Sequence, residues 1–267
     1  MNKTHKSLDV TSSDVDEWVR FANELADSAR TIARRYFRTR TLVESKSDAT
    51  PVTVADREIE TVLRAALAQR YPDHGIIGEE YGAHGTEQSK VWVLDPIDGT
   101  QAFITGVPLF GSLISLVVFD TPVLGIIEMP ALKERWVGTR GAVVKNGQSV
   151  QTSGLAQLSE AALFATSPNM FTSEERPKFD ALACAVKRVR YGTDCYAYGL
   201  VAEGLADLVV EADMAAHDYM ALIPVVEGAG GTITDWEGRP LGLKSSGQVL
   251  AAASQQLHGA ALEYLRG

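Results

Sequence analysis

The sequence has few cysteines and no hydrophobic run long enough to cross a membrane. Only Cys184 and Cys195 occur among 267 residues, and their spacing matches neither a zinc site nor a disulfide framework. The longest apolar-leaning run, Leu109–Phe119, is too short to span a bilayer, and the polar N-terminus has no signal-peptide core. We therefore expect a cytoplasmic protein with reduced thiols and no membrane partner.

Positive charge is also scarce. There are 25 Lys and Arg residues against 34 Asp and Glu residues, which gives a formal net charge of −9. A surface of this sign repels the phosphates of nucleic acids and of anionic lipids, so neither is an expected partner. An anionic substrate would need a cation at its binding site.

The hydrophobic pattern predicts a mixed α and β protein. Apolar residues at helical spacing predict helices over 14–37, preceded by Ser13, and over 55–70, and short apolar runs predict strands over 75–78 and 91–94. β-Branched runs over 112–150 predict an antiparallel sheet. The Asn146-Gly147 pair within it is typical of a two-residue hairpin.

Strands and helices alternate from about Ala161 onward, which is typical of an α/β arrangement. One of these helices is expected to begin near Asp218. We interpret 1–267 as one catalytic unit of two fused lobes, an α+β lobe over 12–152 and an α/β lobe over 158–267.

Two acids follow the apolar run 91–94 on either side of a proline. Asp95 and Asp98 flank Pro96, which removes an amide donor and favours extended backbone at Asp95. We expect a sharp turn that aims both carboxylates at one point. Gly99 permits close backbone approach, and a helix beginning near Thr100 would offer free amides to a phosphate.

Other carboxylates fit the same site. Glu79 and Glu80 follow the strand over 75–78, Asp56 lies in the first turn of a helix, and Asp218 opens another. Two carboxylates about 4 Å apart repel by about 4 kcal/mol at an effective dielectric near 20, so such a cluster needs cations. Oxygen donors alone favour a hard ion such as Mg²⁺.

The acidic and glycine motifs occur in the order found in one enzyme superfamily: Asp56, Glu79-Glu80, Asp95-Pro96-Ile97-Asp98-Gly99-Thr100, and Asp218 before Gly230-Gly231. The chain thereby resembles the inositol monophosphatase superfamily over most of its length. This resemblance implies a layered α-β-α-β-α sandwich, two or three Mg²⁺ ions and a homodimer. It also implies hydrolysis of a small phosphorylated metabolite by a metal-activated water, with no covalent phosphoenzyme.

The resemblance also implies roles for individual residues. The metal ligands it implies are Glu79, Asp95, the carbonyl of Ile97, Asp98 and Asp218. Thr53 and Asp56 match the Thr-x-x-Asp element of the family, which orients the attacking water together with Glu80 and Thr100. Gly99 and Thr100 are the expected phosphate-binding residues.

The segment 190–199 resembles the histidinol-phosphate phosphatase branch of the superfamily. Asp194 adds a carboxylate where a polyol would need neutral groups, whereas the ammonium of histidinol phosphate would form charge-assisted hydrogen bonds with it. Glu211 occupies the position where the family places a substrate-contacting acid. We predict that Asp194, Glu211 and Arg190 bind the substrate and that His217 is a packing residue.

Several alternatives stay open. Asp194 could cap the following helix, with Tyr196 and Tyr198 in the core, and Asp218 alone could be a helix N-cap. The substrate could be inositol-1-phosphate or a broad set of sugar phosphates. A catalytically silent, metal-responsive binding protein is a further alternative, although Thr53 and Glu80, which serve the water rather than the metal, argue against it.

Overall fold

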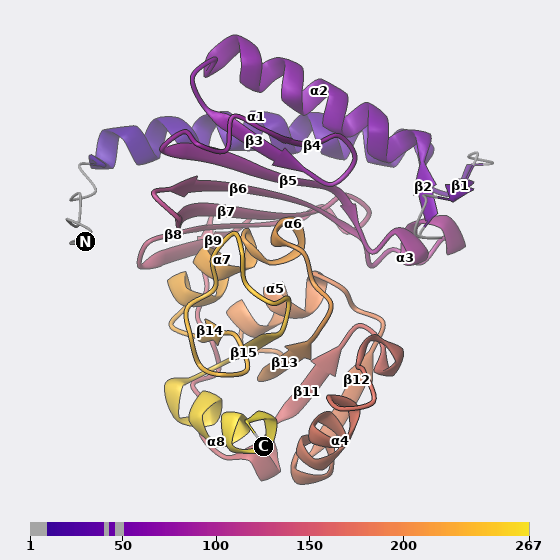
Figure 1. The fold of residues 1–267 in the computed structure, drawn as a ribbon, viewed down its shortest axis with the longest axis vertical. Helices are drawn as coiled ribbons and strands as arrows, with labels where there is room; N and C mark the ends of the chain where they lie inside the picture. Colours follow the sequence, from indigo (N-terminus) through magenta and orange to yellow (C-terminus); the bar gives the residue numbers. More distant parts are fainter. Residues whose placement is uncertain (1–9, 40–42, 46–50, 267) are drawn as a thin grey trace.

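The chain is arranged in five layers of alternating helices and sheets (Figure 1). A computed structural model of the protein describes residues 10–39, 43–45 and 51–266. Within these residues, α1 and α2 cover one face of the larger sheet, α5 and α7 lie between the two sheets, and α4 and α8 cover the far face of the smaller sheet. The predicted α-β-α-β-α sandwich is confirmed.

The helices have the following bounds: α1 (Ser12–Tyr36), α2 (Val54–Arg70), α3 (Thr100–Thr105), α4 (Arg176–Ala185), α5 (Tyr196–Ala202), α6 (Ala216–Tyr219), α7 (Leu222–Gly228) and α8 (Gln255–Leu265), with 3₁₀ turns η1 (Leu158–Glu160) and η2 (Pro168–Met170). No helix in the described part of the chain combines the length and hydrophobicity that crossing a membrane requires.

The two longest helices begin with the same capping motif. Thr11 and Thr53 precede α1 and α2, and each hydroxyl accepts a backbone N–H of the first turn. The acid three residues later, Asp14 or Asp56, accepts the N–H of that threonine. The helices predicted over 14–37 and 55–70 are therefore confirmed, with α1 starting two residues and α2 one residue earlier than expected.

The larger sheet has the strand order β10-β9-β8-β7-β6-β5-β3-β4. Its strands are β3 (Gly75–Gly78), β4 (Gly82–His84), β5 (Lys90–Asp98), β6 (Gly111–Val118), β7 (Thr121–Met129), β8 (Glu134–Thr139), β9 (Ala142–Lys145) and β10 (Gln148–Ser149). Neighbouring strands are antiparallel except β3 and β5, so the sheet predicted over 112–150 is confirmed. Asn146 and Gly147 form the hairpin turn with φ of 48° and 81°.

The smaller sheet has the order β12-β11-β13-β15-β14. Its strands are β11 (Ala162–Ala165), β12 (Arg188–Tyr191), β13 (Leu208–Glu211), β14 (Thr232–Thr234) and β15 (Val249–Ala252), and a separate hairpin pairs β1 (Val43–Ser45) with β2 (Pro51–Thr53). The core between the two sheets includes Val93 of β5 and Val209 of β13, one from each proposed lobe. The two-lobe organisation stays a prediction.

A buried ion-pair network attaches α1 to the larger sheet. Glu128 of β7 is fully buried, and its carboxylate accepts hydrogen bonds from Arg30 of α1 and Arg135 of β8. Arg135 also donates to Asp27 and Asn23 of α1. Leaving one of these charges unpaired would cost several kcal/mol, on the order of 3–5, so the network fixes how α1 lies on the sheet.

The sharp turn expected at Pro96 is wrong. β5 continues through Pro96 to Asp98, and its pairing with β6 shifts register between Asp95 and Asp98. Such a bulge leaves a residue outside the ladder, so the missing amide of proline costs nothing there. The hydroxyl of Ser112 donates to the Pro96 carbonyl at 2.6 Å. The bulge, rather than a turn, directs both carboxylates.

Candidate active site

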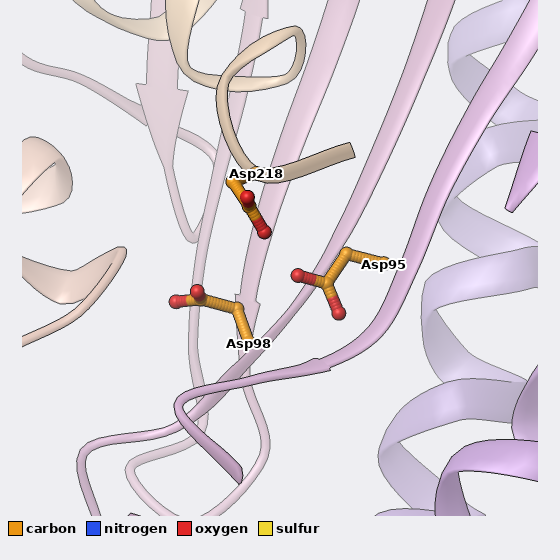
Figure 2. Close-up of side chains that lie close together, drawn as sticks. All are labelled: Asp95, Asp98 and Asp218. Atoms are coloured by element: carbon orange, nitrogen blue, oxygen red, sulfur yellow. The ribbon is translucent and has the colours of Figure 1, made fainter. Parts of the chain in front are cut away.

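Three aspartates from distant parts of the chain lie together beside the end of β5 (Figure 2). Asp95 and Asp98 come from the bulged end of β5, and Asp218 comes from α6, which packs against that strand. One carboxylate oxygen from each lies within 4.8 Å of the others. The structure thus brings together the acids for which the sequence predicted a common site.

These carboxylates are largely withdrawn from water, with Asp95 buried and Asp98 and Asp218 partly buried. Burial raises the pKa of Asp95 well above its usual range, and the charges of Glu79, Asp98 and Asp218 raise it further. Burial raises the pKa of Asp98 to about 6, although the Cys195 amide, which donates to Asp98 at 2.7 Å, acts in the opposite direction. Without a cation, the cluster therefore destabilises the fold.

The donor set fits a hard divalent cation. Asp95 Oδ1 is buried and has no hydrogen-bond partner, which a bound cation would supply. Glu79 lines the same cavity as Asp218. The Ile97 carbonyl accepts a hydrogen bond from the Thr100 hydroxyl at 3.1 Å. All of these donors are oxygens, as Mg²⁺ prefers.

Asp56 lies close to the Glu79-Glu80 turn. It is 1% exposed, and its Oδ2 accepts both the backbone N–H, at 2.9 Å, and the hydroxyl of Thr53. Burial raises the pKa of Asp56 to about 6, the two Thr53 bonds oppose this, and the charges of Glu80 and Glu79 add to it. Asp56, a predicted water-orienting residue, thus lies near the turn that carries the predicted metal ligand Glu79.

A cavity of about 920 Å³ opens beside the aspartates. Gly99 and Thr100 line it at the start of α3, and Gly99 has φ of 79°, a left-handed conformation that favours glycine. Its charged lining in the described residues consists of four carboxylates and one histidine, with no lysine or arginine: Glu79, Asp194, Asp213, Asp218 and His217. A cation or a cationic ligand suits such a wall.

Asp194 lines this cavity directly. Its backbone has φ of 44°, and a Cβ added at Gly99 would lie 3.1 Å from its carboxyl carbon. Burial raises the pKa of Asp194 to about 8, and the charges of Asp98 and Glu211 contribute. The alternative that Asp194 caps a helix is wrong, because α5 begins with no side-chain cap. Tyr198 is in the core, as that alternative expected.

Glu211 and Arg190, the other two predicted substrate-binding residues, are not among the residues that line the cavity. Glu211 is buried beneath the cavity, where it accepts the Thr166 amide at 2.9 Å and the Tyr198 hydroxyl at 2.8 Å, and burial raises its pKa to about 7. Glu211 is linked to the cavity by its bond to Thr166, because Thr166 is a lining residue. Arg190 is exposed on the edge strand β12 and is not among the lining residues. Both assignments stay predictions.

The surroundings of Asp218 differ from expectation. Asp218 does not begin a helix: it is the third residue of α6, and its carboxylate accepts the Ala215 N–H at 2.7 Å. His217, expected to be a packing residue, lines the cavity with Nε2 3.6 Å from Asp218 Oδ1. Sequence reasoning also missed Asp213, a single acid that no motif marks.

Comparison with known proteins identifies the family. Residues 14–267 match the model of the inositol monophosphatase family. The chain belongs to this family and is a phosphatase of it. It is 42% identical to the bifunctional phosphatase IMPL2 of Arabidopsis thaliana, a chloroplastic protein, over 96% of this chain and 77% of that one.

Two further relatives carry different substrate names. A histidinol-phosphatase of Mycobacterium tuberculosis is 38% identical over 80% of this chain and 85% of its own length. The solved structure of an inositol monophosphatase from Zymomonas mobilis is 42% identical, with a TM-score of 0.87, over 97% of this chain and 100% of that one. Phosphatases of the inositol monophosphatase family depend on metal ions and act on small phosphorylated substrates, which agrees with the acidic cluster.

Proposed function

We propose that this phosphatase is a Mg²⁺-dependent histidinol-phosphatase of histidine biosynthesis, which converts L-histidinol phosphate to L-histidinol and phosphate. The observation that carries this proposal is the charge of the cavity wall, where Asp194 and Asp213 lie beyond the aspartate cluster with no basic side chain among the lining residues described. A nearby ammonium or imidazolium would lower the pKa of Asp194, so that Asp194 binds the substrate as a carboxylate, whereas a neutral polyol would leave these acids unpaired. The relatives named histidinol-phosphatase support the same substrate.

The residues near the cluster would have three roles: binding the metal ions, orienting the attacking water and binding the phosphate. Glu79, Asp95, Asp98, Asp218 and the Ile97 carbonyl would hold two or three Mg²⁺ ions, which supply positive charge against the phosphate and acidify the attacking water. Thr53, Asp56, Glu80 and Thr100 would orient that water, and Asp56 could accept a proton near neutral pH. Gly99 and Thr100 would contact the phosphate.

Phosphate release from a panel of esters tests the substrate. We expect L-histidinol phosphate to give the highest kcat/KM, and release to stop when Mg²⁺ is chelated. A higher kcat/KM for inositol-1-phosphate would favour the broader sugar-phosphate alternative. Absence of release from every ester would instead favour a silent binding protein.

Asp194→Asn should change specificity more than turnover. A hydrogen bond to a charged group contributes about 1.5–3 kcal/mol, so we expect kcat/KM for L-histidinol phosphate to fall by about 10–100-fold. Inositol-1-phosphate carries no cation, and its kcat/KM should change less than about threefold. Asp213 is exposed, so Asp213→Asn should have a smaller effect. Equal losses on both substrates would contradict the assignment of Asp194.

The stabilisation by Mg²⁺ should depend on pH. In the metal-free protein burial raises the pKa of Asp98 from 3.8 to about 6. A carboxyl group of this kind stabilises the fold when protonated, below pH 3.8, and loses that contribution as the pH rises through 6. Because Mg²⁺ competes with these protons, its effect on Tm should be largest near pH 8 and nearly vanish by about pH 5. Melting curves with Mg²⁺ or chelator measure this, and a shift independent of pH would contradict it.

A further inference from the structure

One buried acid beside the site has no part in the mechanism above. Glu60 lies on α2, one turn after Asp56, and is fully buried. Its Oε2 accepts the backbone N–H of Glu80 at 2.7 Å, and its Oε1 accepts the N–H of Tyr81 at 3.1 Å. The same Oε1 accepts Nε of Arg64 at 2.7 Å. Glu60 therefore bonds the backbone of the turn that carries Glu79.

We propose that Glu60 is a positioning residue for the metal and water-orienting acids. Its carboxylate fixes the backbone of the segment 79–81, so that Glu79 faces the aspartate cluster while Glu80 faces Asp56. This inference rests on the proposed function, since it gives Glu79 and Glu80 the roles named there.

The turn depends on this side chain for its backbone hydrogen bonds. β3 ends at Gly78 and β4 begins at Gly82, so the residues between them lie outside the strand ladder. The Glu79 N–H donates to the Leu94 carbonyl at 3.3 Å, and the next two N–H groups donate to Glu60. A partly buried amide without an acceptor costs up to about 1–3 kcal/mol, so loss of the carboxylate would destabilise the backbone of the turn.

Arg64 and Gly78 hold the carboxylate in place. Besides pairing with Glu60, Arg64 donates through Nη2 to the Gly82 carbonyl, which follows the turn. At Gly78 an added Cβ would overlap the Glu60 carboxylate, so glycine is what allows α2 and the turn to lie this close. The charge of Glu60 is offset by Arg64 and two amides, so it adds little repulsion to the site.

Helix α2 thereby positions both Asp56 and the Glu79-Glu80 segment. Its first turn carries Asp56, bonded to Thr53, and its second turn carries Glu60, bonded to the Glu79-Glu80 segment. α2 packs against β5, the strand that carries Asp95 and Asp98. Residues that orient metal ligands influence metal affinity, so a substitution at Glu60 should weaken binding at the cation site.

Glu60→Gln tests this inference. Glutamine keeps the shape but has a single acceptor oxygen, so it cannot serve both amides and Arg64. By calorimetry we expect the Kd for Mg²⁺ to rise by about 10–100-fold. At fixed Mg²⁺, kcat should fall while KM for the ester changes less than about threefold. The Glu80 and Tyr81 amides should exchange with deuterium faster than in the wild type.

Glu128→Gln is the matched control, because Glu128 is equally buried and paired with two arginines but bonds no part of the turn. It should lower Tm and leave the Kd for Mg²⁺ unchanged. Gly78→Ala is a second test, since its methyl group displaces the Glu60 carboxylate without removing it. It should weaken Mg²⁺ binding as Glu60→Gln does, even if Glu60→Gln folds poorly.

The inference is overturned if both Glu60→Gln and Gly78→Ala bind Mg²⁺ with the wild-type Kd. Glu60 would then only link α2 to the sheet. Failure of the proposed function would show differently: wild-type protein would release phosphate from no ester, while Mg²⁺ binding and amide exchange in the variants would still decide the role of Glu60.

Discussion

Asp95→Asn should abolish phosphate release while leaving the metal-free protein as stable as the wild type or more stable. Asp95 is 2% exposed, and burial together with three neighbouring carboxylates raises its pKa. Replacing it with a neutral isostere removes one of these like charges, which relieves repulsion when no cation is present. The same change removes a carboxylate from the cation site, so kcat/KM should fall by at least about 10³-fold.

Two melting temperatures, with chelator and with Mg²⁺, separate these effects. In Asp95→Asn, the melting temperature with chelator should equal or exceed that of the wild type, and the increase on adding Mg²⁺ should largely disappear. Asp207→Asn is a suitable control, because Asp207 accepts the Ser153 hydroxyl and the Ala162 amide, and none of these three residues lines the cavity. It should lower both temperatures and preserve their difference. A large loss of metal-free stability in Asp95→Asn would make Asp95 a structural hydrogen-bonding residue.

Local patterns predicted the main elements of this fold well. The helical spacing of apolar residues such as Leu25 and Leu63 predicted the starts of α1 and α2 to within two residues, because a one-sided apolar face depends only on residues near in sequence. The grouping of Asp95, Asp98 and Asp218 came from the order of motifs. Nothing in the spacing itself shows that α6 packs against β5.

Features that depend on packing between elements were predicted poorly. The bulge at Pro96 requires the register of β6, which the segment around Pro96 does not encode. Arg190 lies in a motif-rich segment, but β12 is an edge strand and Arg190 is exposed there outside the cavity lining, so its role stays a prediction. Asp213 lines the cavity and has a φ of 60°, and no motif around it predicts either feature.

Asp56→Asn should remove turnover but keep metal binding, unlike Asp95→Asn. Asp56 is bonded to Thr53 and is not one of the three clustered aspartates. A group that orients water or accepts its proton contributes about 10²–10⁴-fold, so kcat should fall by that factor. The Kd for Mg²⁺, from calorimetry, should change less than about threefold, because the cluster keeps its carboxylates.

The matched control lies in α1, where Asp14 makes the same capping motif with Thr11. Asp14 is only partly buried, whereas Asp56 is buried beside Glu79 and Glu80. Asparagine keeps an acceptor for the N–H of the threonine, so each substitution should cost at most about 1 kcal/mol of stability. Only Asp56→Asn should lose activity. If both variants hydrolyse the ester like the wild type, Asp56 is a helix cap and the water is oriented by other groups.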